Sequence, residues 1–426
     1  MPIFTQIILL GLMLTSFTGA YADNPHEPST DVDRLVAVLV AKGTLTRDEA
    51  AEILGELDRV PIVDMSNSRS ANSSQLATSE VPVRIKITGD LRLRAQTDDR
   101  TGLPEGAQVA EEAGEGRYLW RLGVDIPVQE RWQVGFGLTS GGSDPRSNNQ
   151  TFTDAFQTYD ARIDYAYASY RFNDRVQLTG GKFDNPLWNA KDLLWDTDIR
   201  PEGAMVASRL LDNERLRLDL STGGLILSDK ESDISQDAYM WVAQLHARWQ
   251  VNENWSLDLA PAYYFSQDLQ GTPGLTDNAV PTNSRDANGN LLYDYDAATL
   301  SGAVTWQPPA LVQQAQWFGE LIHATDPSDD SIGWLAGTRF GAQRLDQLWA
   351  WQFSYNYRRL EQDAWPEFLQ DSDFLFGATG VKGSEFELKI ALGANTSIGL
   401  DYYVNNELLD TDIEQDLLQL DLNLSW

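Results

Sequence analysis

Residues 83–94 read Val-Arg-Ile-Lys-Ile-Thr-Gly-Asp-Leu-Arg-Leu-Arg, with an apolar residue or glycine at every odd position and a polar residue at every even one. Successive side chains of a strand point to opposite faces, so this repeat of two predicts a strand with one apolar and one polar face. An Arg or Lys that faces lipid costs about 2–4 kcal/mol at the membrane midplane. In a membrane-spanning strand, the charged face would therefore line a polar lumen.

The same repeat continues along the chain and predicts sixteen strands in all. The other fifteen are 117–126, 132–139, 161–172, 175–183, 204–211, 215–227, 239–250, 255–266, 293–306, 314–325, 333–341, 349–360, 385–393, 398–404 and 417–426. Their connections alternate between short and long, as the turns and loops of bacterial outer-membrane barrels do. We therefore predict an all-β fold, a 16-stranded antiparallel transmembrane β-barrel over residues 83–426, which leaves an aqueous channel.

The alternation assigns the basic side chains of the first, second and seventh predicted strands to the lumen. These predicted pore-lining residues are Arg84, Lys86, Arg92, Arg94, Arg117, Arg121, Arg215 and Arg217. Rings of charged side chains can select among ions. The alternative is that these residues only form ion pairs that stiffen the wall.

Residues 182–203 are too polar and too interrupted by proline to form a strand, yet they carry apolar and aromatic anchors such as Leu193, Leu194 and Trp195. We expect this loop to fold back into the barrel and narrow it. Its predicted constriction residues are Asp184, Asn185, Lys191, Asp192, Asp196, Asp198, Arg200 and Glu202. The alternative is an ordinary surface loop, because long loops are often but not always functional.

The first 82 residues differ from the rest. Residues 7–14 are apolar and Ala20-Tyr21-Ala22 follows, which predicts a cleaved signal peptide over residues 1–22, although no Lys or Arg precedes the apolar run. A retained anchor is the alternative. A capping box at residues 46–49 predicts a periplasmic helical hairpin over residues 23–60, and a polar linker follows at 61–82.

The chain contains 63 acidic and 32 basic residues, a formal net charge of −31, which argues against a nucleic-acid partner. We expect the surplus carboxylates between strands, including Asp371 and Asp373, to lie in solvated loops. Cysteine is absent, which excludes disulfides, thiolate metal sites and a cysteine nucleophile. No later segment has 18 consecutive apolar residues, so membrane spans must be strands.

The residues give little support for an enzyme. The three histidines are His26, His246 and His323, and no Ser, His and orienting partner are recognisable as a set. Residues 286–290 resemble part of a calcium loop but lack its bidentate Glu, so they predict an Asn-Gly turn. We predict no catalytic residue, metal site or cofactor.

Several short segments resemble Gram-negative outer-membrane porins, specifically the group named putative porins. They are residues 89–94, 121–123, Pro145 with 148–151, 182–186, 195–196, 198–199 and 201–203. The resemblance implies a channel for passive diffusion of small hydrophilic solutes or ions, surrounded by outer-membrane lipid, in which the loop after the fifth strand enters the lumen. It also implies that barrel-assembly machinery recognises the terminal Trp426, where Phe is commoner, and that a homotrimer is the usual assembly. The alternative function is a surface receptor, adhesin or structural outer-membrane β-protein without an open channel.

Overall fold

The computed structural model describes Thr46 and residues 85–103, 112–229, 237–275, 281–308, 312–408 and 413–426. The chain divides into two compact units, Met1–Glu80 and Val81–Trp426. The predicted signal peptide, linker and Arg84 lie outside the described residues, as does the predicted helical hairpin except for Thr46. Among the described residues, no helix has the length and hydrophobicity to cross a membrane.

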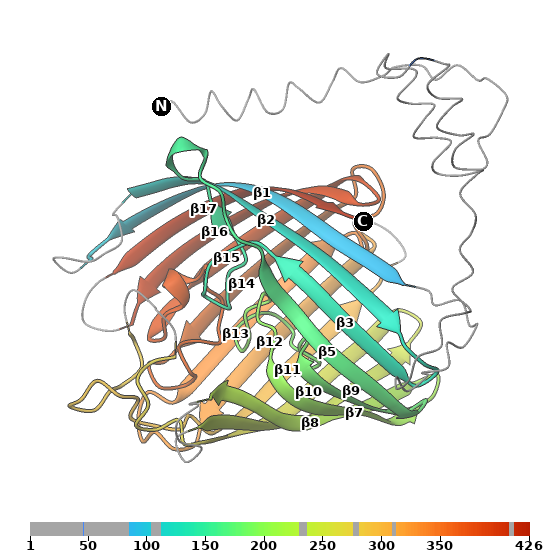
Figure 1. Ribbon diagram of the computed structural model, residues 1–426, viewed down its shortest axis with the longest axis horizontal. Coiled ribbons are helices and arrows are strands. Elements are labelled where there is room, and N and C mark those ends of the chain that lie inside the picture. The colour runs from blue at the N-terminus through green and yellow to red at the C-terminus, as the bar shows by residue number, and fades with distance from the viewer. Residues whose placement is uncertain are drawn as a thin grey trace, which may run out of the picture. The chain divides into compact units, whose positions relative to one another are not determined.

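The second unit is a closed antiparallel barrel (Figure 1). Its strands are β1 (Lys86–Thr101), β2 (Glu112–Pro127), β3 (Trp132–Thr139), β4 (Gln150–Thr151), β5 (Arg162–Asn173), β6 (Val176–Lys182), β7 (Glu202–Asp212), β8 (Leu216–Ser228), β9 (Ala238–Asn252), β10 (Trp255–Gln267), β11 (Ala297–Trp306), β12 (Gln314–Ala324), β13 (Ile332–Gly341), β14 (Trp351–Leu360), β15 (Val381–Gly393), β16 (Thr396–Glu407) and β17 (Glu414–Ser425). The two-residue β4 pairs with β2 inside a loop, and the other sixteen strands form the wall, which β17 closes by pairing with β1. The predicted 16-stranded barrel is confirmed.

Strand boundaries differ most from the prediction at the long-loop end of the barrel. β1 continues past the predicted end at Arg94 to Thr101, and β2 begins at Glu112 rather than at Arg117. Polar residues of these extensions pair with each other, and those of β1 also pair with β17. The apolar alternation in the sequence ends where the lipid-facing side chains end, whereas the backbone hydrogen bonds between the strands continue.

The two faces of the wall have the polarity expected of a membrane barrel. On β1, Leu93 is 38% exposed on the outer face whereas its neighbour Arg94 is only 5% exposed. The same contrast separates the exposed Leu418 and Leu400 from the buried Gln419 and Asp401. Apolar side chains therefore cover the outside and charged side chains line the lumen, as predicted.

The wall connections at one rim are all short, and we call this end the short-turn rim. They are residues 128–131, 174–175, 213–215, 253–254, 307–313, 342–350 and 394–395. In bacterial outer-membrane barrels the short turns face the periplasm. The predicted turn at 286–290 is also present, in a long loop at the other rim, where the Gly289 N–H donates to the Asp286 carbonyl (3.0 Å).

A hydrophobic core lies inside the barrel. It is formed by three loops between β6 and β7, β10 and β11, and β14 and β15, which pack against lumen-facing residues such as Met240 and Tyr264. Loop residues in this core include Phe183, Leu187, Leu193, Leu194, Trp195, Ile199, Leu269, Leu291, Tyr295, Trp365, Phe368, Leu369, Phe374 and Leu375. The loops therefore fill part of the space that sixteen strands enclose.

Candidate pore constriction

Two glycines allow the loop of residues 183–201 to leave the wall. Gly181 and Gly203 are cross-strand partners with φ values of +117° and +145°, which residues with side chains rarely adopt. A Cβ atom at either position would lie 2.3 Å from a backbone carbonyl oxygen, that of Ala166 or Gly224. The Phe183 N–H then donates to the Pro201 carbonyl (3.1 Å) and closes the base of the loop.

Side chains of the distant wall bind the backbone of this loop. Glu320 on β12 accepts hydrogen bonds from the N–H groups of Ala190 (2.8 Å), Lys191 (2.9 Å) and Leu193 (3.0 Å). Gln244 on β9 accepts from the Trp188 N–H (2.7 Å) and donates to the Trp188 carbonyl (2.9 Å). Buried backbone groups need such partners, and here the wall supplies them in place of secondary structure.

The aromatic anchors of the loop are buried within the lumen. The Trp195 indole N–H donates to the Tyr264 hydroxyl on β10 (3.2 Å). The Trp365 indole N–H, from the loop between β14 and β15, donates to the Leu194 carbonyl (2.7 Å). Leu193 and Leu194 are completely buried. The alternative of an ordinary surface loop does not agree with these contacts.

The loop of residues 361–380 is a second inward segment, which sequence reasoning missed. The Asp196 N–H donates to the Leu369 carbonyl (2.6 Å), and the Ser372 N–H donates to the Asp196 carboxylate (2.8 Å). Aromatic anchors at Trp365 and Phe374 were the available signal, because the same kind of residues marked the first loop. The two loops are therefore joined to each other.

The expectation that Asp371 and Asp373 lie in solvated loops is wrong. Asp371 pairs with Arg358 on β14 (3.3 Å), and Asp373 pairs with Arg94 on β1 (3.1 Å). The apolar anchors of the 361–380 loop draw these carboxylates into the lumen, where wall arginines compensate their charge. Acidic composition alone could not distinguish this arrangement from solvation.

A compact ion-pair cluster joins the first loop to β14 and β15. Arg358, which is 2% exposed, pairs with Asp192 (2.7 Å), Glu385 (2.8 Å) and Asp371. Lys191 pairs with Glu385 (2.8 Å) and Asp192 (3.3 Å). The three carboxylates lie close enough to hold a metal ion, but Arg358 and Lys191 already bind them.

Two of the basic residues predicted on β1 and β2, Arg94 and Arg121, contact the two loops. Arg94 binds both oxygens of Asp421 on β17 (2.8 Å each) as well as Asp373. Arg121 pairs with Asp198 of the first loop. Arg92 donates to Asn149 (2.9 Å), and Arg117 lies 4.0 Å from Glu115.

The remaining predicted residues lie closer to the loop base or to the short-turn rim. Arg200 pairs with Asp184 (3.1 Å), and Asn185 accepts from the Leu187 N–H (3.0 Å). Glu202 is the first residue of β7 and pairs with Lys182 (2.7 Å). At the short-turn end, Lys86 begins β1, Arg215 lies in the turn before β8, and Arg217 pairs with Asp219 (2.6 Å).

A cavity of about 360 Å³ remains between the two loops and the wall of β1, β15, β16 and β17. Its carboxylates are Asp192, Asp196, Asp198, Asp371, Asp373, Glu385, Glu387, Asp401 and Asp421, and its basic residues are Arg92, Arg94, Arg146, Lys191 and Lys389. Nine carboxylates against five basic side chains make the lining acidic. Sequence reasoning missed Asp401, which is 8% exposed and forms no ion pair with any residue that the structure describes.

Solved structures similar to this chain include two porins. Pseudomonas putida OprB has a TM-score of 0.50 at 10% sequence identity, over 80% of this chain and 94% of that chain. Salmonella typhi OmpF has a TM-score of 0.47 at 11% identity, over 80% of this chain and 97% of that chain. No curated protein matches the chain.

At such low sequence identities, similarity to a solved structure concerns the fold alone. A match to a family model provides the evidence for the family. The family model described as putative porin matches residues 101–291 and 285–426, which is most of the barrel. This family and fold are those of a non-enzymatic channel protein of the outer membrane. The chain therefore belongs to the putative porin family, and it is a Gram-negative outer-membrane porin.

Proposed function

We propose that small hydrophilic solutes and ions cross this porin by passive diffusion, and that residues 183–201, together with 361–380, form the constriction of the channel. The observation that carries the proposal is the reach of the first loop across the lumen. The loop begins after β6 and ends before β7. Counted around the ring of sixteen wall strands, β14 lies eight strands from β6, and β15 lies eight strands from β7. Asp192 and Lys191 nevertheless bind Arg358 and Glu385 on those opposite strands.

We further propose that the constriction prefers cations. A charged lining in a narrow, low-dielectric passage concentrates ions of the opposite sign. The cavity lining carries nine carboxylates and five basic side chains. Asp401 on β16 also lines this cavity and has no ion-pair partner within the described part of the chain.

The test is the current through purified, folded protein in a planar bilayer. We expect stepwise ohmic conductance and, under a KCl gradient, a reversal potential of the sign given by cation preference. Silent bilayers from folded protein would overturn the channel and favour the receptor or structural alternative. A reversal potential near zero would overturn only the cation preference.

A double variant tests the loop itself. Asp196→Asn with Asp198→Asn removes two carboxylates from the cavity lining, and we expect the reversal potential to shift towards anions. The matched control is Asp329→Asn with Asp330→Asn, which makes the same two substitutions in an exposed loop. If both variants keep the original reversal potential, the first loop does not form the constriction.

Three further predictions concern export and assembly. They are export through a cleaved signal peptide of residues 1–22, recognition of Trp426 by barrel-assembly machinery, and association into a homotrimer. Each follows from the sequence or from the resemblance to porins. Mass spectrometry of the mature N-terminus, and native electrophoresis of the extracted protein, would test the first and the last.

A further inference from the structure

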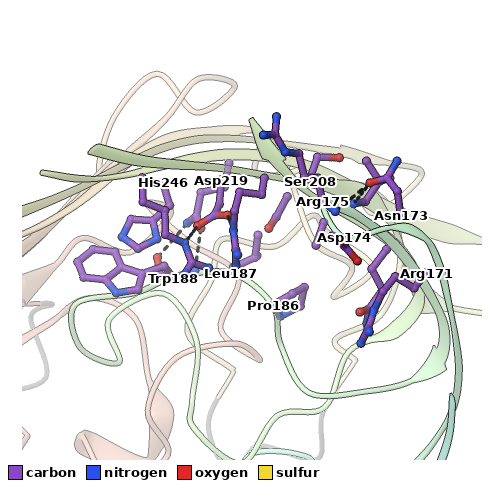
Figure 2. A pocket seen from close by; sticks show the side chains of 17 residues that line it. Arg171, Asn173, Asp174, Arg175, Pro186, Leu187, Trp188, Ser208, Asp219 and His246 are labelled. Carbon is purple, nitrogen blue, oxygen red and sulfur yellow. Dashed lines mark hydrogen bonds and ion pairs between the residues drawn. The ribbon is translucent and has the colours of Figure 1, made fainter. Parts of the chain in front are cut away.

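A second hollow, of about 400 Å³, lies at the short-turn rim on the side of the barrel formed by β5–β9. We call it the rim hollow. Figure 2 shows Pro186, Leu187 and Trp188 of the first loop on one side of it, with Asn173, Asp174 and Arg175 of the β5–β6 turn opposite. β7, β8 and β9 supply the rest of its lining, including Ser208, Asp219 and His246.

Four arginines line the rim hollow against two carboxylates, in a chain with a net charge of −31. The carboxylate of Asp219 is bound by both Arg209 (3.2 Å) and Arg217 (2.6 Å). The guanidinium groups of Arg171 and Arg175 form no ion pair or hydrogen bond with any residue that the structure describes. These two guanidinium groups therefore keep their donors available to a ligand.

The opposite side of the rim hollow is held in a fixed position. Trp188 stacks on His246, with 4.8 Å between ring centroids and an interplanar angle of 12°. Gln244 fixes the Trp188 backbone through two hydrogen bonds, and the His246 ring is 2.8 Å from Asp258 on β10. The positive groups thus face a partly apolar surface that wall residues hold in place.

The free arginines have no visible structural role. The β5–β6 turn is held by Asn173, whose side-chain oxygen accepts from the N–H groups of Arg175 (2.8 Å) and Val176 (3.0 Å). The guanidinium groups are not needed for that turn. A guanidinium is planar and matches carboxylate and phosphate oxygens in a bidentate manner.

From these observations we propose that the rim hollow is a binding site for small oxyanions, meaning solutes that carry carboxylate or phosphate groups. The site is separate from the acidic cavity beside the constriction, so the channel presents two regions of opposite charge to a solute. A solute that carries both an ammonium and a carboxylate group would find a complementary partner in each region.

The direct test is calorimetric titration of citrate, and separately of inorganic phosphate, into folded protein in detergent at about 0.1 M salt. We expect saturable binding, and a rise in Kd of at least about tenfold for the double variant Arg171→Gln/Arg175→Gln. The tighter of the two probes identifies carboxylates or phosphates as the preferred group. The control is Arg344→Gln, on another turn of the same rim, where Arg344 pairs with Asp346 (3.2 Å). At this salt the Debye length is about 10 Å, so a distant charge has little effect on the site.

Absence of binding to the unaltered protein, or equal loss in the control and the double variant, would overturn the proposal. A second readout uses the channel and so depends on the proposed function: citrate added at the short-turn side should reduce the open-channel current, and should do so less in the double variant. Citrate binding without any conductance would overturn the channel and leave the site. Conductance without citrate binding would overturn the binding site and leave the channel.

Discussion

Glu320 shows how one residue of the wall positions a whole loop. Its carboxylate lies on β12 and accepts three N–H groups from residues 190–193, none of which belongs to a strand. A buried N–H without a partner costs about 1–3 kcal/mol. Glu320 therefore removes this cost for three N–H groups of an irregular segment inside the barrel.

Replacing Glu320 with Ala should release the loop without unfolding the barrel, because water can then reach the freed N–H groups. We expect a higher single-channel conductance and more current noise in planar bilayers. Glu320→Gln keeps one acceptor oxygen and should give an intermediate result. The control is Glu130→Ala in an exposed short turn. Unaltered current in Glu320→Ala would show that the loop does not limit conduction.

The cluster around Arg358 predicts a pH dependence. Three carboxylates, Asp192, Asp371 and Glu385, share two cations, Arg358 and Lys191. One proton therefore completes the charge balance. Burial and the neighbouring Asp192 raise the pKa of Asp371 well above its ordinary value, although Arg358 opposes the shift. Burial acts in the same direction on Asp192, but Lys191 and Arg358 hold the pKa of that group below its ordinary value.

A raised pKa means that the folded protein holds the proton more tightly than the unfolded chain does. The resulting stabilisation is complete below the ordinary pKa of 3.8 and is lost as the pH rises through the raised value. Asp371→Asn mimics the protonated group, so its thermal unfolding midpoint should fall less than that of the unaltered protein as the pH rises. Asp329→Asn, in an exposed loop, should leave the pH dependence unchanged. Parallel curves for all three proteins would exclude Asp371 as the site of the proton.

At the scale of elements, residues 361–380 act as a second inward wall that supports the first loop. Trp365 is fully buried and donates its indole N–H to the Leu194 carbonyl. Truncating a buried Trp to Ala costs about 3–5 kcal/mol. That cost falls on the contact between the two loops and on the packing of Trp365 against Tyr264 of β10.

Trp365→Ala should therefore increase single-channel conductance, as Glu320→Ala should, because Glu320 on the wall and Trp365 on the second loop both hydrogen-bond the backbone of the first loop. Trp349→Ala is the control, because Trp349 lies in a short connection and is 67% exposed. The expected result is a larger current step for the first variant only. A larger step for both would point to a general loosening of the barrel.

The strands were predictable because each has an alternating pattern that the membrane imposes residue by residue. The wall ring, its closure and the inward direction of Arg94 and Arg121 all follow from that local rule. Where the first loop docks does not follow from it, because the partners of residues 190–193 include Glu320 and Arg358, which are distant in sequence. Aromatic anchors indicate that a loop packs, but they do not indicate against which strand.

At the scale of the whole molecule, stability depends on the seam between β1 and β17. Gly89 and Trp426 exchange backbone hydrogen bonds (3.1 and 3.0 Å). A Cβ atom at Gly89 would lie 2.3 Å from the indole ring of Trp426. The seam therefore has no room for a side chain at this position.

Gly89→Val should weaken the closed barrel, since overpacking typically costs about 1–3 kcal/mol. When samples are heated stepwise before gel electrophoresis, the folded barrel should convert to the unfolded form at a temperature several degrees lower. Gly142→Val is the control, because nothing lies within 4 Å of a Cβ atom there. Equal conversion temperatures for Gly89→Val and the unaltered protein would show that the seam tolerates the extra volume.

The apolar packing inside the barrel has a consequence for how such proteins diversify. Sixteen strands determine the diameter of the cylinder, whereas the three packed loops take up part of its interior and leave a cavity beside β1 and β15–β17. The inside of the barrel can therefore change independently of the strands that form its wall. Substitutions in a few tens of loop residues can change which molecules pass, while the lipid-facing surface and the hydrogen-bonded wall stay the same.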